Sequence, residues 1–330
     1  MRKLTGLVVV LFVLWGGWWA FTSRMETRLV RAAFAERKAA GWTADYSSLG
    51  VAGFPNRLDL TVNDIALGAP GTGVIWRAPF AQVLGLTYNP WHVIAAFPNS
   101  QEIETPAGTF TLGSSRMEAS LEPRPGLDFT LASIVAVIDK PVVTASLGWQ
   151  VSADYVRVAT RQVPGRASAQ EIGVETANVT PDAALHAALD PTGTLPPALS
   201  RIYLDAEAGF TAPIDRRSAT TPPLLTDLAV KQADVLWGPM RLSATGKVTV
   251  DAQGTPAGRI TLSAKGWRQM VPVAVALGLV RPELEQTVTN MLAELAKGSG
   301  KPDTVDLPLV FEKGWMSLGP LPLGPAPRLR

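Results

Sequence analysis

Residues 57–67 read RLDLTVNDIAL, a stretch in which apolar and polar side chains alternate. Leu58, Leu60 and Val62 recur at every second position, which is the period of a β-strand with one buried face. The apolar phase then moves by one residue, to positions 65 and 67. A slip of one residue inside a continuous alternation predicts a β-bulge at Asn63–Asp64.

The same alternation returns along most of the chain after Trp42. Further runs occupy residues 109–112, 117–121, 202–210, 242–250 and 260–264. Asp251–Gly254 lies between two of these runs, and Lys313–Gly314 lies between residues 307–311 and 315–318, so each predicts a hairpin turn. Short strands separated by Gly and Pro predict a mainly β fold: a large antiparallel β-meander, built as a curled sheet or a sandwich, with few helices.

Helices are predicted at only two places beyond the first 41 residues. Thr180, Pro181 and Asp182 supply a capping hydroxyl, a first-turn proline and an early acid, which predict a helix to about Leu189. Residues 269–279 are apolar all round, and Pro282 then opens a helix whose apolar side chains share one face. That helix is expected to end within the loop 298–302.

Residues 4–23, LTGLVVVLFVLWGGWWAFTS, form an uncharged run close to the N-terminus. As a helix this run spans about 30 Å, the thickness of the hydrocarbon core of a bilayer. Trp15, Trp18 and Trp19 gather near its far end, where indole rings favour the headgroup level. The run therefore predicts one N-terminal transmembrane helix.

A cleaved signal peptide and a buried core helix are the alternatives for this run. Cleavage needs small residues one and three positions before the cut, whereas the candidate region WWAFTS is mostly bulky. The length of the run and its place beside the N-terminus argue against a core helix. An uncleaved signal anchor is therefore the favoured interpretation.

The charges beside the run give conflicting signals about orientation. Arg2 and Lys3 precede it, whereas five basic residues follow it at positions 24, 28, 31, 37 and 38, so a simple positive-inside count favours a cytoplasmic bulk. A short basic head before an apolar run is nevertheless typical of an export signal, and long domains cross despite their charges. We expect a single-pass protein of the inner (cytoplasmic) membrane with its bulk in the periplasm.

These features divide the chain into three predicted parts. Residues 1–23 form a cytoplasmic tip and the transmembrane anchor, residues 24–41 a stalk helix that stops at Gly41, and residues 42–330 a β-rich exported domain. Pro- and Gly-rich stretches suggest an internal boundary near residues 191–223. The last residues, GPLPLGPAPRLR, are too rich in proline for a central strand and predict an extended tail.

The composition excludes several functional classes. The chain has 30 Lys and Arg against 28 Asp and Glu, a net charge of +2 that lacks the clustered basic residues of a nucleic-acid-binding protein. The absence of cysteine excludes disulfides, thiolate catalysis and iron–sulfur ligation. Charged residues make up only 18% and hydrophobic residues 47%, so the chain buries a large core or exposes apolar surface.

No residue pattern requires catalysis, a cofactor or a metal. His92 and His186 are interpreted as structural residues, because zinc needs three or four ligands in recognised spacings. The Gly-rich residues 68–73 are followed by a strand rather than by a helix with Lys-Ser/Thr, so they predict a turn and not a phosphate loop. We therefore expect no catalytic, cofactor-binding or metal-binding residues and no enzymatic activity.

Several short segments form a recognisable set across most of the chain. They are the basic start with its single span, GFPNR at 53–57, WRAP at 76–79, LTYNPWHV at 86–93, DLPL at 306–309, GW at 314–315 and LGPLPLG at 318–324. The set resembles domain-of-unknown-function family 2125, a family of uncharacterised bacterial proteins. This resemblance implies export across the inner membrane of a Gram-negative-type bacterium and implies no activity.

The layout is similar, more loosely, to AsmA-like proteins, in which one N-terminal anchor precedes a long β-meander outside the cytoplasm. Those proteins are associated with lipid traffic and envelope assembly, and the similarity is one of architecture alone.

Three functional hypotheses follow from this layout. In the leading one, a twisted sheet leaves its apolar face open as a groove for lipid or another apolar ligand, in the service of envelope maintenance. The residues expected to line the groove are Leu58, Leu60, Val62, Leu242, Val248, Val250, Ile260 and Leu262. An ordinary sandwich core is the competing interpretation of the same residues.

The second hypothesis is a structural protein of the inner membrane that meets envelope proteins through a sheet edge or the last helices. The third and least favoured is a periplasmic hydrolase with paired carboxylates.

Overall fold

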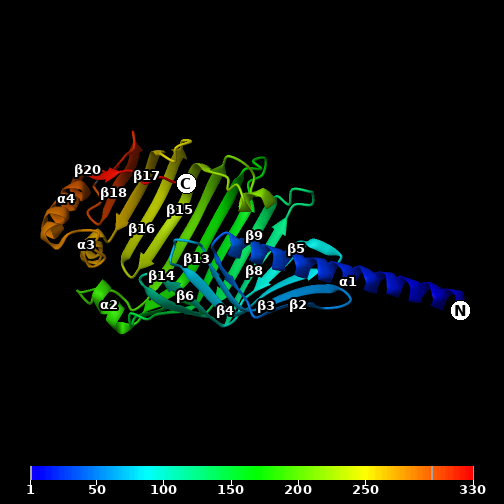
Figure 1. Ribbon diagram of the computed structural model, residues 1–330. Coiled ribbons are helices and arrows are strands. Elements are labelled where there is room, and N and C mark those ends of the chain that lie inside the picture. Colours follow the sequence, from blue (N-terminus) through cyan, green and yellow to red (C-terminus); the bar gives the residue numbers. More distant parts are fainter. Residues whose placement is uncertain (1, 299, 330) are drawn as a thin grey trace. The chain divides into compact units, whose positions relative to one another are not determined.

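The computed structural model describes residues 2–298 and 300–329; Met1, Ser299 and Arg330, which belong to the predicted tip, loop and tail, lie outside the described residues. About 49% of the chain is strand and 23% is helix, and the strands pair antiparallel (Figure 1), which confirms the predicted mainly β class. The chain divides into two compact units. Unit 1 comprises Met1–Pro123 and Ala136–Gly148, and unit 2 comprises Arg124–Val135 and Trp149–Arg330. The predicted boundary region 191–223 lies within unit 2.

Unit 1 joins the N-terminal helix to an antiparallel sheet centred on the hairpin of β3 and β4. The strands β1 and β2 pair with one side of β3, whereas β4 pairs with β6 near its start and with β5 near its end. The elements of this unit are α1 (Arg2–Ala39), β1 (Thr43–Asp45), β2 (Ser48–Ala52), β3 (Arg57–Gly68), β4 (Ile75–Leu86), β5 (Asn89–Ala96), β6 (Ser100–Thr105), β7 (Gly108–Gly113), β8 (Arg116–Pro123) and β10 (Val142–Ala145). The strand β9 (Leu131–Asp139) has residues in both units.

The strand β3 confirms the alternation of residues 57–67 but lacks the expected bulge. The register between β3 and β4 stays constant along the whole ladder, so no extra residue is inserted. Asp64 instead takes a left-handed φ of 49°. Val62 and Ile65, which lie on alternate phases of the strand, pack in one core cluster with Ala78. A single residue with a left-handed backbone thus changes which positions of β3 face the core, and the register with β4 stays the same.

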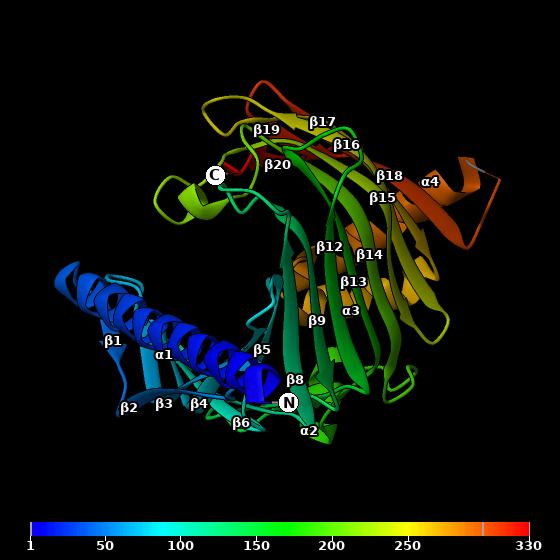
Figure 2. The same cartoon turned by 90° about the vertical axis from the view of Figure 1, so that its right-hand side faces the viewer.

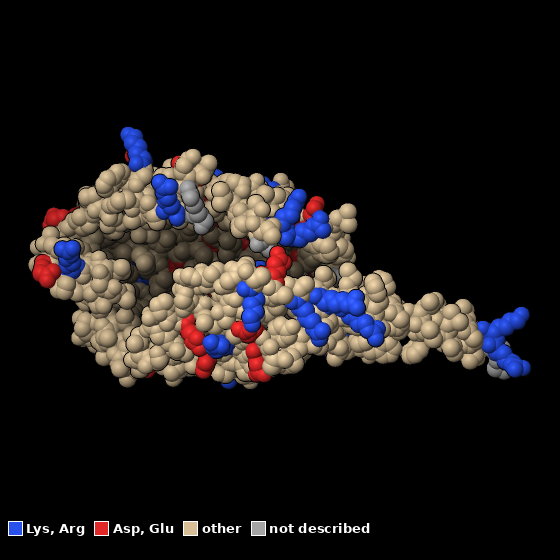
Figure 3. All heavy atoms as spheres, in the orientation of Figure 1, with Lys and Arg blue, Asp and Glu red and all other residues tan. Residues whose placement is uncertain are grey.

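Helix α1 runs without a break from Arg2 to Ala39, and within the part of the chain that the structure describes it is the one helix long and apolar enough to span a membrane. Figure 3 shows basic side chains at its free tip and again where it meets the sheet, with an uncharged stretch between them. Phe34 near its end stacks edge-to-face on Tyr46, with ring centroids 4.9 Å apart, and joins the Val62 cluster. The last turns of α1 therefore pack on the sheet of unit 1.

Unit 2 is one long antiparallel meander from β12 to β20, in which each strand pairs with the next. Its strands are β11 (Gln150–Ser152), β12 (Tyr155–Gln162), β13 (Ala169–Pro181), β14 (Leu199–Phe210), β15 (Leu225–Trp237), β16 (Met240–Val250), β17 (Pro256–Lys265), β18 (Thr304–Glu312), β19 (Trp315–Leu318) and β20 (Leu321–Pro325). Its helices are α2 (Ala183–Leu189), α3 (Trp267–Ala276), α4 (Glu285–Gly298) and two 3₁₀ turns, Arg216–Ala219 and Pro282–Leu284.

The predicted helices and turns of unit 2 are present, with shifted ends. Thr180 and Pro181 end β13, and Asp182 is the N-cap of α2, with its carboxylate accepting from the backbone N–H of Leu185. The turns at Asp251–Gly254 and Lys313–Gly314 join β16 to β17 and β18 to β19, as predicted. The C-terminal segment is not a free tail, because β20 pairs with β19 at the edge of the sheet.

The register of unit 2 separates apolar and polar residues onto opposite faces, because residues directly opposite in antiparallel strands point to the same side. One row across β13 to β18 is apolar: Val174, Leu204, Ala233, Ala244, Leu262 and Leu307. The adjacent row, on the other face, is polar: Glu175, Tyr203, Asp234, Ser243, Ser263 and Asp306. The sheet therefore has one apolar face and one charged face.

The sheet of unit 2 curls strongly, as Figure 2 shows for strands β12 to β17. Two glycines on the apolar face, Gly246 of β16 and Gly258 of β17, adopt φ values of 153° and 141°. A Cβ atom at Gly246 would lie 2.3 Å from the carbonyl oxygen of Arg259, and one at Gly258 would lie 2.4 Å from that of Lys247. The missing side chains therefore let β16 and β17 approach and bend where any other residue would clash.

We expect Gly246→Ala to destabilise the protein by about 2 kcal/mol or more, because the substitution adds both backbone strain and a backbone clash. Urea denaturation of the full-length protein in detergent measures this loss. Gly173→Ala is the matched control in β13, where a Cβ atom would lie 3.9 Å from the nearest atom, and it should leave the stability unchanged or slightly higher. Equal effects of the two substitutions would contradict the close approach.

Candidate apolar binding site

An apolar cavity of about 400 Å³ lies where α2 and α3 meet the ends of β14, β15 and β16. The helix α3 supplies the side chains of one wall, and the sheet supplies those of the other. All eleven lining residues are hydrophobic: Leu189, Leu199, Val235, Trp237, Met240, Leu242, Met270, Val273, Ala274, Leu277 and Leu279. Such a cavity suits an apolar ligand and offers no charged group to a polar one.

The base of this cavity is held rigidly. Trp237 is buried, and its indole N–H donates to the carbonyl of Pro196 at 2.7 Å. His186 of α2 stacks edge-to-face on Trp237 with ring centroids 5.8 Å apart, and its Nε2 lies 3.1 Å from the same carbonyl. His186 therefore positions the aromatic floor, and it faces a backbone carbonyl rather than the cavity.

Large apolar side chains at the rim of the cavity are exposed to solvent. Leu277 and Leu279, at the end of α3 and just beyond it, are 54% and 76% exposed, and Leu242 on the sheet is 39% exposed. Gly278 between the two leucines has a φ of 70° and ends the helix. Large apolar side chains at an open rim are a marker of a binding site, because their exposure costs free energy in water.

The cavity continues into the apolar face of the sheet through Val235 and Leu242, which belong to both. The helices α3 and α4 cover only the end of this face, where Ala264 and Leu307 pack against their core cluster. Further along, the apolar side chains are only half-buried, as at Ile172, Val174, Leu204, Ile260, Leu262 and Leu309. An apolar strip therefore leads away from the cavity across several strands.

Three polar side-chain oxygens interrupt this strip at its β12 and β13 edge. The Oγ1 atoms of Thr160 and Thr176 and the Oε1 atom of Gln170 are buried and have no hydrogen-bond partner within the described residues. Thr160 and Gln170 lie on the apolar face, opposite Ile172 and Ala208. These buried oxygens mark a polar edge of the apolar strip.

The eight residues predicted to line a groove fall into two sets. Leu242, Val248, Val250, Ile260 and Leu262 lie on the apolar face of unit 2, since they share one phase of β16 and β17. Leu242 lines the cavity, and Val248, 2% exposed, is fully packed.

The other three predicted residues, Leu58, Leu60 and Val62, belong to β3 of unit 1. Leu60 and Val62 are buried, and Val62 packs with Phe34 of α1 and with Leu49 of β2. The structure therefore brings five of the eight residues together on one face, and a single lining made of all eight stays a prediction.

Most of the cavity residues were missed by sequence reasoning. The apolar stretch 269–279 was the one sequence feature that could have revealed them. It predicts a helix with no polar face, and such a helix is either covered on all sides or completes a binding site. Leu189 and Leu199 gave no signal, because they meet Met270 only through folding of the long loop between α2 and β14.

The model of the bacterial family described as "uncharacterized protein conserved in bacteria", domain-of-unknown-function family 2125, matches residues 18–327. The chain belongs to this family. No curated protein and no solved structure matches the chain. The family membership confirms the resemblance of the short segments, and it assigns no activity to the cavity.

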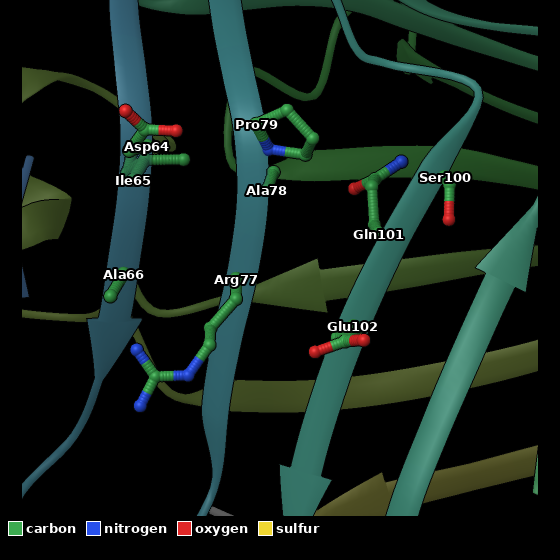
Figure 4. Close-up of a pocket in the computed structure, with 9 residues that line it drawn as sticks. All are labelled: Asp64, Ile65, Ala66, Arg77, Ala78, Pro79, Ser100, Gln101 and Glu102. Atoms are coloured by element: carbon green, nitrogen blue, oxygen red, sulfur yellow. The ribbon is translucent and has the colours of Figure 1, made fainter.

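A second cavity in this member of family 2125, about 380 Å³, opens in the sheet of unit 1 where β4 leaves β6 to pair with β5 (Figure 4). The groups around it are already paired. The indole N–H of Trp76 donates to Oε1 of Gln101 at 2.9 Å, and Arg77 forms an ion pair with Glu104 at 2.7 Å. The cavity is open, and both polar and apolar side chains, such as Glu102 and Ile65, line it.

The titratable groups gather into ion pairs, such as Arg166 with Glu207 and Asp227, in the described residues. No group of three His, Asp or Glu side chains there could hold a metal ion. Asp182 and Asp190 lie four positions on either side of His186, but hydrogen bonds from the backbone N–H groups of Leu185 and Leu195 occupy their carboxylates. The backbone hydrogen bond from Leu185 lowers the pKa of Asp182, and the Thr192 hydroxyl, followed by the backbone N–H of Leu195, lowers the pKa of Asp190, so both aspartates act as caps of the α2 region.

The charged face of unit 2 is stabilised by a network centred on Asp234 of β15. Burial alone raises the pKa of Asp234, but hydrogen bonds from Ser243, Gln232 and Arg241 outweigh it and hold the pKa below its usual range. The Ser243 hydroxyl donates at 2.7 Å and the Arg241 guanidinium at 3.0 Å. The carboxylate of Asp234 thus ties β15 to β16 directly behind the cavity.

We expect Asp234→Asn to reduce the free energy of unfolding at pH 7 by about 2 kcal/mol, the typical worth of a charge-assisted hydrogen bond. Because the folded pKa is depressed, this stability is present above the unfolded value near 3.9 and is lost as pH falls through the folded pKa. Urea titrations across that range should show the difference from wild type shrinking on acidification. Asp306→Asn, at an exposed position of the same face, is the control and should have little effect at any pH; a pH-independent loss in Asp234→Asn would contradict the charged network.

Proposed function

We propose that this protein binds a lipid or another apolar ligand on unit 2 and serves envelope maintenance from an inner-membrane anchor, without catalysis. The observation that supports this most is the cavity lined by eleven hydrophobic residues, which continues into a half-exposed apolar sheet face. A face of this kind left in water costs free energy, and an apolar ligand removes that cost.

The size of the cavity favours a long ligand over a small one. Each methylene that a ligand buries against apolar surface contributes about 0.8 kcal/mol to its binding. A micromolar complex needs about 8 kcal/mol after the losses of association are subtracted. A ligand that extends from the cavity onto the strip with Ile260 and Leu262, as an acyl chain can, buries more methylenes and therefore binds more tightly.

The N-terminal helix supports a site of action at a membrane. Its uncharged run is long and apolar enough to keep the chain beside a bilayer, which is the source of acyl chains. A periplasmic location of the β-rich bulk is part of the proposal. The architectural similarity to AsmA-like proteins, which are associated with lipid traffic, agrees with this proposal as an analogy.

A pocket-filling substitution tests the ligand directly. We expect the purified full-length protein to retain lipid in native mass spectrometry, and Ala274→Phe to lower the retained lipid about tenfold, equivalent to about 1.4 kcal/mol. Ala274 lies on α3 and faces the cavity, so the larger side chain occupies the space of the ligand.

Thr245→Phe is the matched control for this experiment, because Thr245 lies on the opposite face of β16 and is exposed. It should leave the retained lipid unchanged, which separates bound ligand from lipid around the anchor. Equal lipid retention in both variants, or none in the wild type, would overturn the ligand proposal.

The placement is tested by single-cysteine labelling, which the cysteine-free chain permits without background. We expect Thr72→Cys, in the exposed turn after β3, to react with a membrane-impermeant maleimide once the outer membrane is permeabilised. Lys3→Cys should react only after the inner membrane is lysed. The reverse pattern would place the bulk in the cytoplasm.

A further inference from the structure

We propose that the tip of the β2–β3 hairpin, residues 53–57, is embedded in the lipid bilayer beside the anchor helix and docks unit 1 on the membrane surface. This inference rests on the membrane anchor of the proposed function and concerns a different part of the molecule from the ligand site. All of its contacts lie within unit 1.

The hairpin tip packs against the middle of the apolar run and not against its end. The ring of Phe54 stacks edge-to-face on Phe12 and on Trp19, with centroid distances of 5.9 and 5.5 Å. Its ring also lies beside Gly16, where a Cβ atom would be 3.7 Å from Phe54. Phe54 therefore fills the flat surface that Gly16 leaves on the helix.

The depth of this contact follows from helix geometry. At 1.5 Å per residue, Trp19 lies roughly 6 Å and Phe12 roughly 16 Å below Ser23 along the axis. If the uncharged run occupies a hydrocarbon core about 30 Å thick, Phe54 lies within the leaflet nearest the sheet. The hairpin cannot reach those residues of the helix and remain in water.

The hydrogen bonds of the tip suit a medium without water, where each backbone polar group needs an internal partner. The indole N–H of Trp15 donates to the carbonyl of Pro55 at 2.8 Å, and that of Trp19 donates to the carbonyl of Arg57 at 2.7 Å. Two of the three indoles predicted to meet lipid headgroups, those of Trp15 and Trp19, thus satisfy hairpin carbonyls instead.

The neighbouring β4–β5 turn completes the tip. The backbone N–H and the hydroxyl of Thr87 both donate to the carbonyl of Asn56 at 3.0 Å. Tyr88 in this turn is 68% exposed and Phe54 is 46% exposed, so two aromatic rings project from adjacent turns. Aromatic side chains of this kind favour the boundary between lipid and water.

Basic side chains lie just above this level on the helix. Arg24, Arg28 and Arg31 line a cleft with Val51 of β2, beginning at the residue that follows Ser23 and continuing for two turns. Guanidinium groups at that height match the phosphates of an anionic leaflet. The surface thus has two exposed aromatic rings, a hydrogen-bonded backbone and a basic collar, and Arg57 of the tip forms an ion pair with Asp59 at 3.0 Å. These features fit a bilayer rather than a protein partner.

Nitroxide accessibility measures the depth of the tip in the full-length protein, reconstituted in vesicles of phosphatidylethanolamine and phosphatidylglycerol. Single-nitroxide variants are made at Phe54→Cys and Tyr88→Cys, with Val8→Cys as a marker of the span. Thr72→Cys is the aqueous control, since it lies at the opposite end of the β3–β4 hairpin. We expect the ratio of oxygen to nickel-chelate accessibility to be several-fold higher at positions 54 and 88 than at position 72.

Two results would overturn the inference, and they are distinguishable. A lipid-like ratio at position 8 with water-like ratios at 54 and 88 would leave the anchor intact and reject the embedded tip. Water-like ratios at 8, 54 and 88 together would reject the anchor itself. Tyr88→Cys replaces an exposed side chain, so it keeps the test valid if Phe54→Cys disturbs the packing on α1.

Discussion

The two-residue period of strands β12 to β18 is the constraint on which unit 2 depends. It places a row such as Val174, Leu204 and Leu262 on one face and charged or hydroxyl side chains on the other. The charged face is held by cross-strand pairs, including Arg201 of β14 with Glu175 of β13 at 2.9 Å. The apolar face is not covered to the same extent by contacts within unit 2, because α3 and α4 pack on only one end of it.

Two features of unit 2 are associated with this exposed apolar face: the curvature of the sheet and the cavity beside α3. Small residues on the apolar face, among them Gly246 and Gly258, let neighbouring strands approach and the sheet curl. The helix α3 then lies over the end of the same face and leaves the cavity of about 400 Å³ between its side chains and those of the sheet. In the function we propose, an apolar ligand covers this face, as a second sheet does in a sandwich.

Local sequence patterns predicted the local structure of this protein well. The uncharged run at 4–23 predicted the first half of α1, the period of two predicted β3 and β16, and the turn residues at Asp251–Gly254 predicted a hairpin. The left-handed Asp64 was mistaken for a bulge, because a shift of apolar phase in one strand cannot reveal the register of its partner. The N-cap moved from Thr180 to Asp182, because pairing with β11 and β14 extends β13 to Pro181.

Contacts between distant segments could not be predicted in this way. Trp15 bonds to a carbonyl 40 positions away, and Trp237 to one 41 positions away, and neither pairing leaves a trace in spacing or periodicity. The same is true of the cavity, whose walls come from residues 189–199, 235–242 and 270–279. Sequence reasoning found the apolar strands of unit 2 but not the helix that turns their end into a site.

A photo-crosslinking amino acid placed at Ile260 in living cells tests whether lipid covers the apolar face of unit 2. This half-buried side chain lies on that face beyond the helices. We expect a covalent lipid adduct at position 260. We expect none at position 261, whose side chain lies on the charged face of the same strand. A protein adduct at position 260, or no adduct at all, would show that this face is covered by something other than lipid.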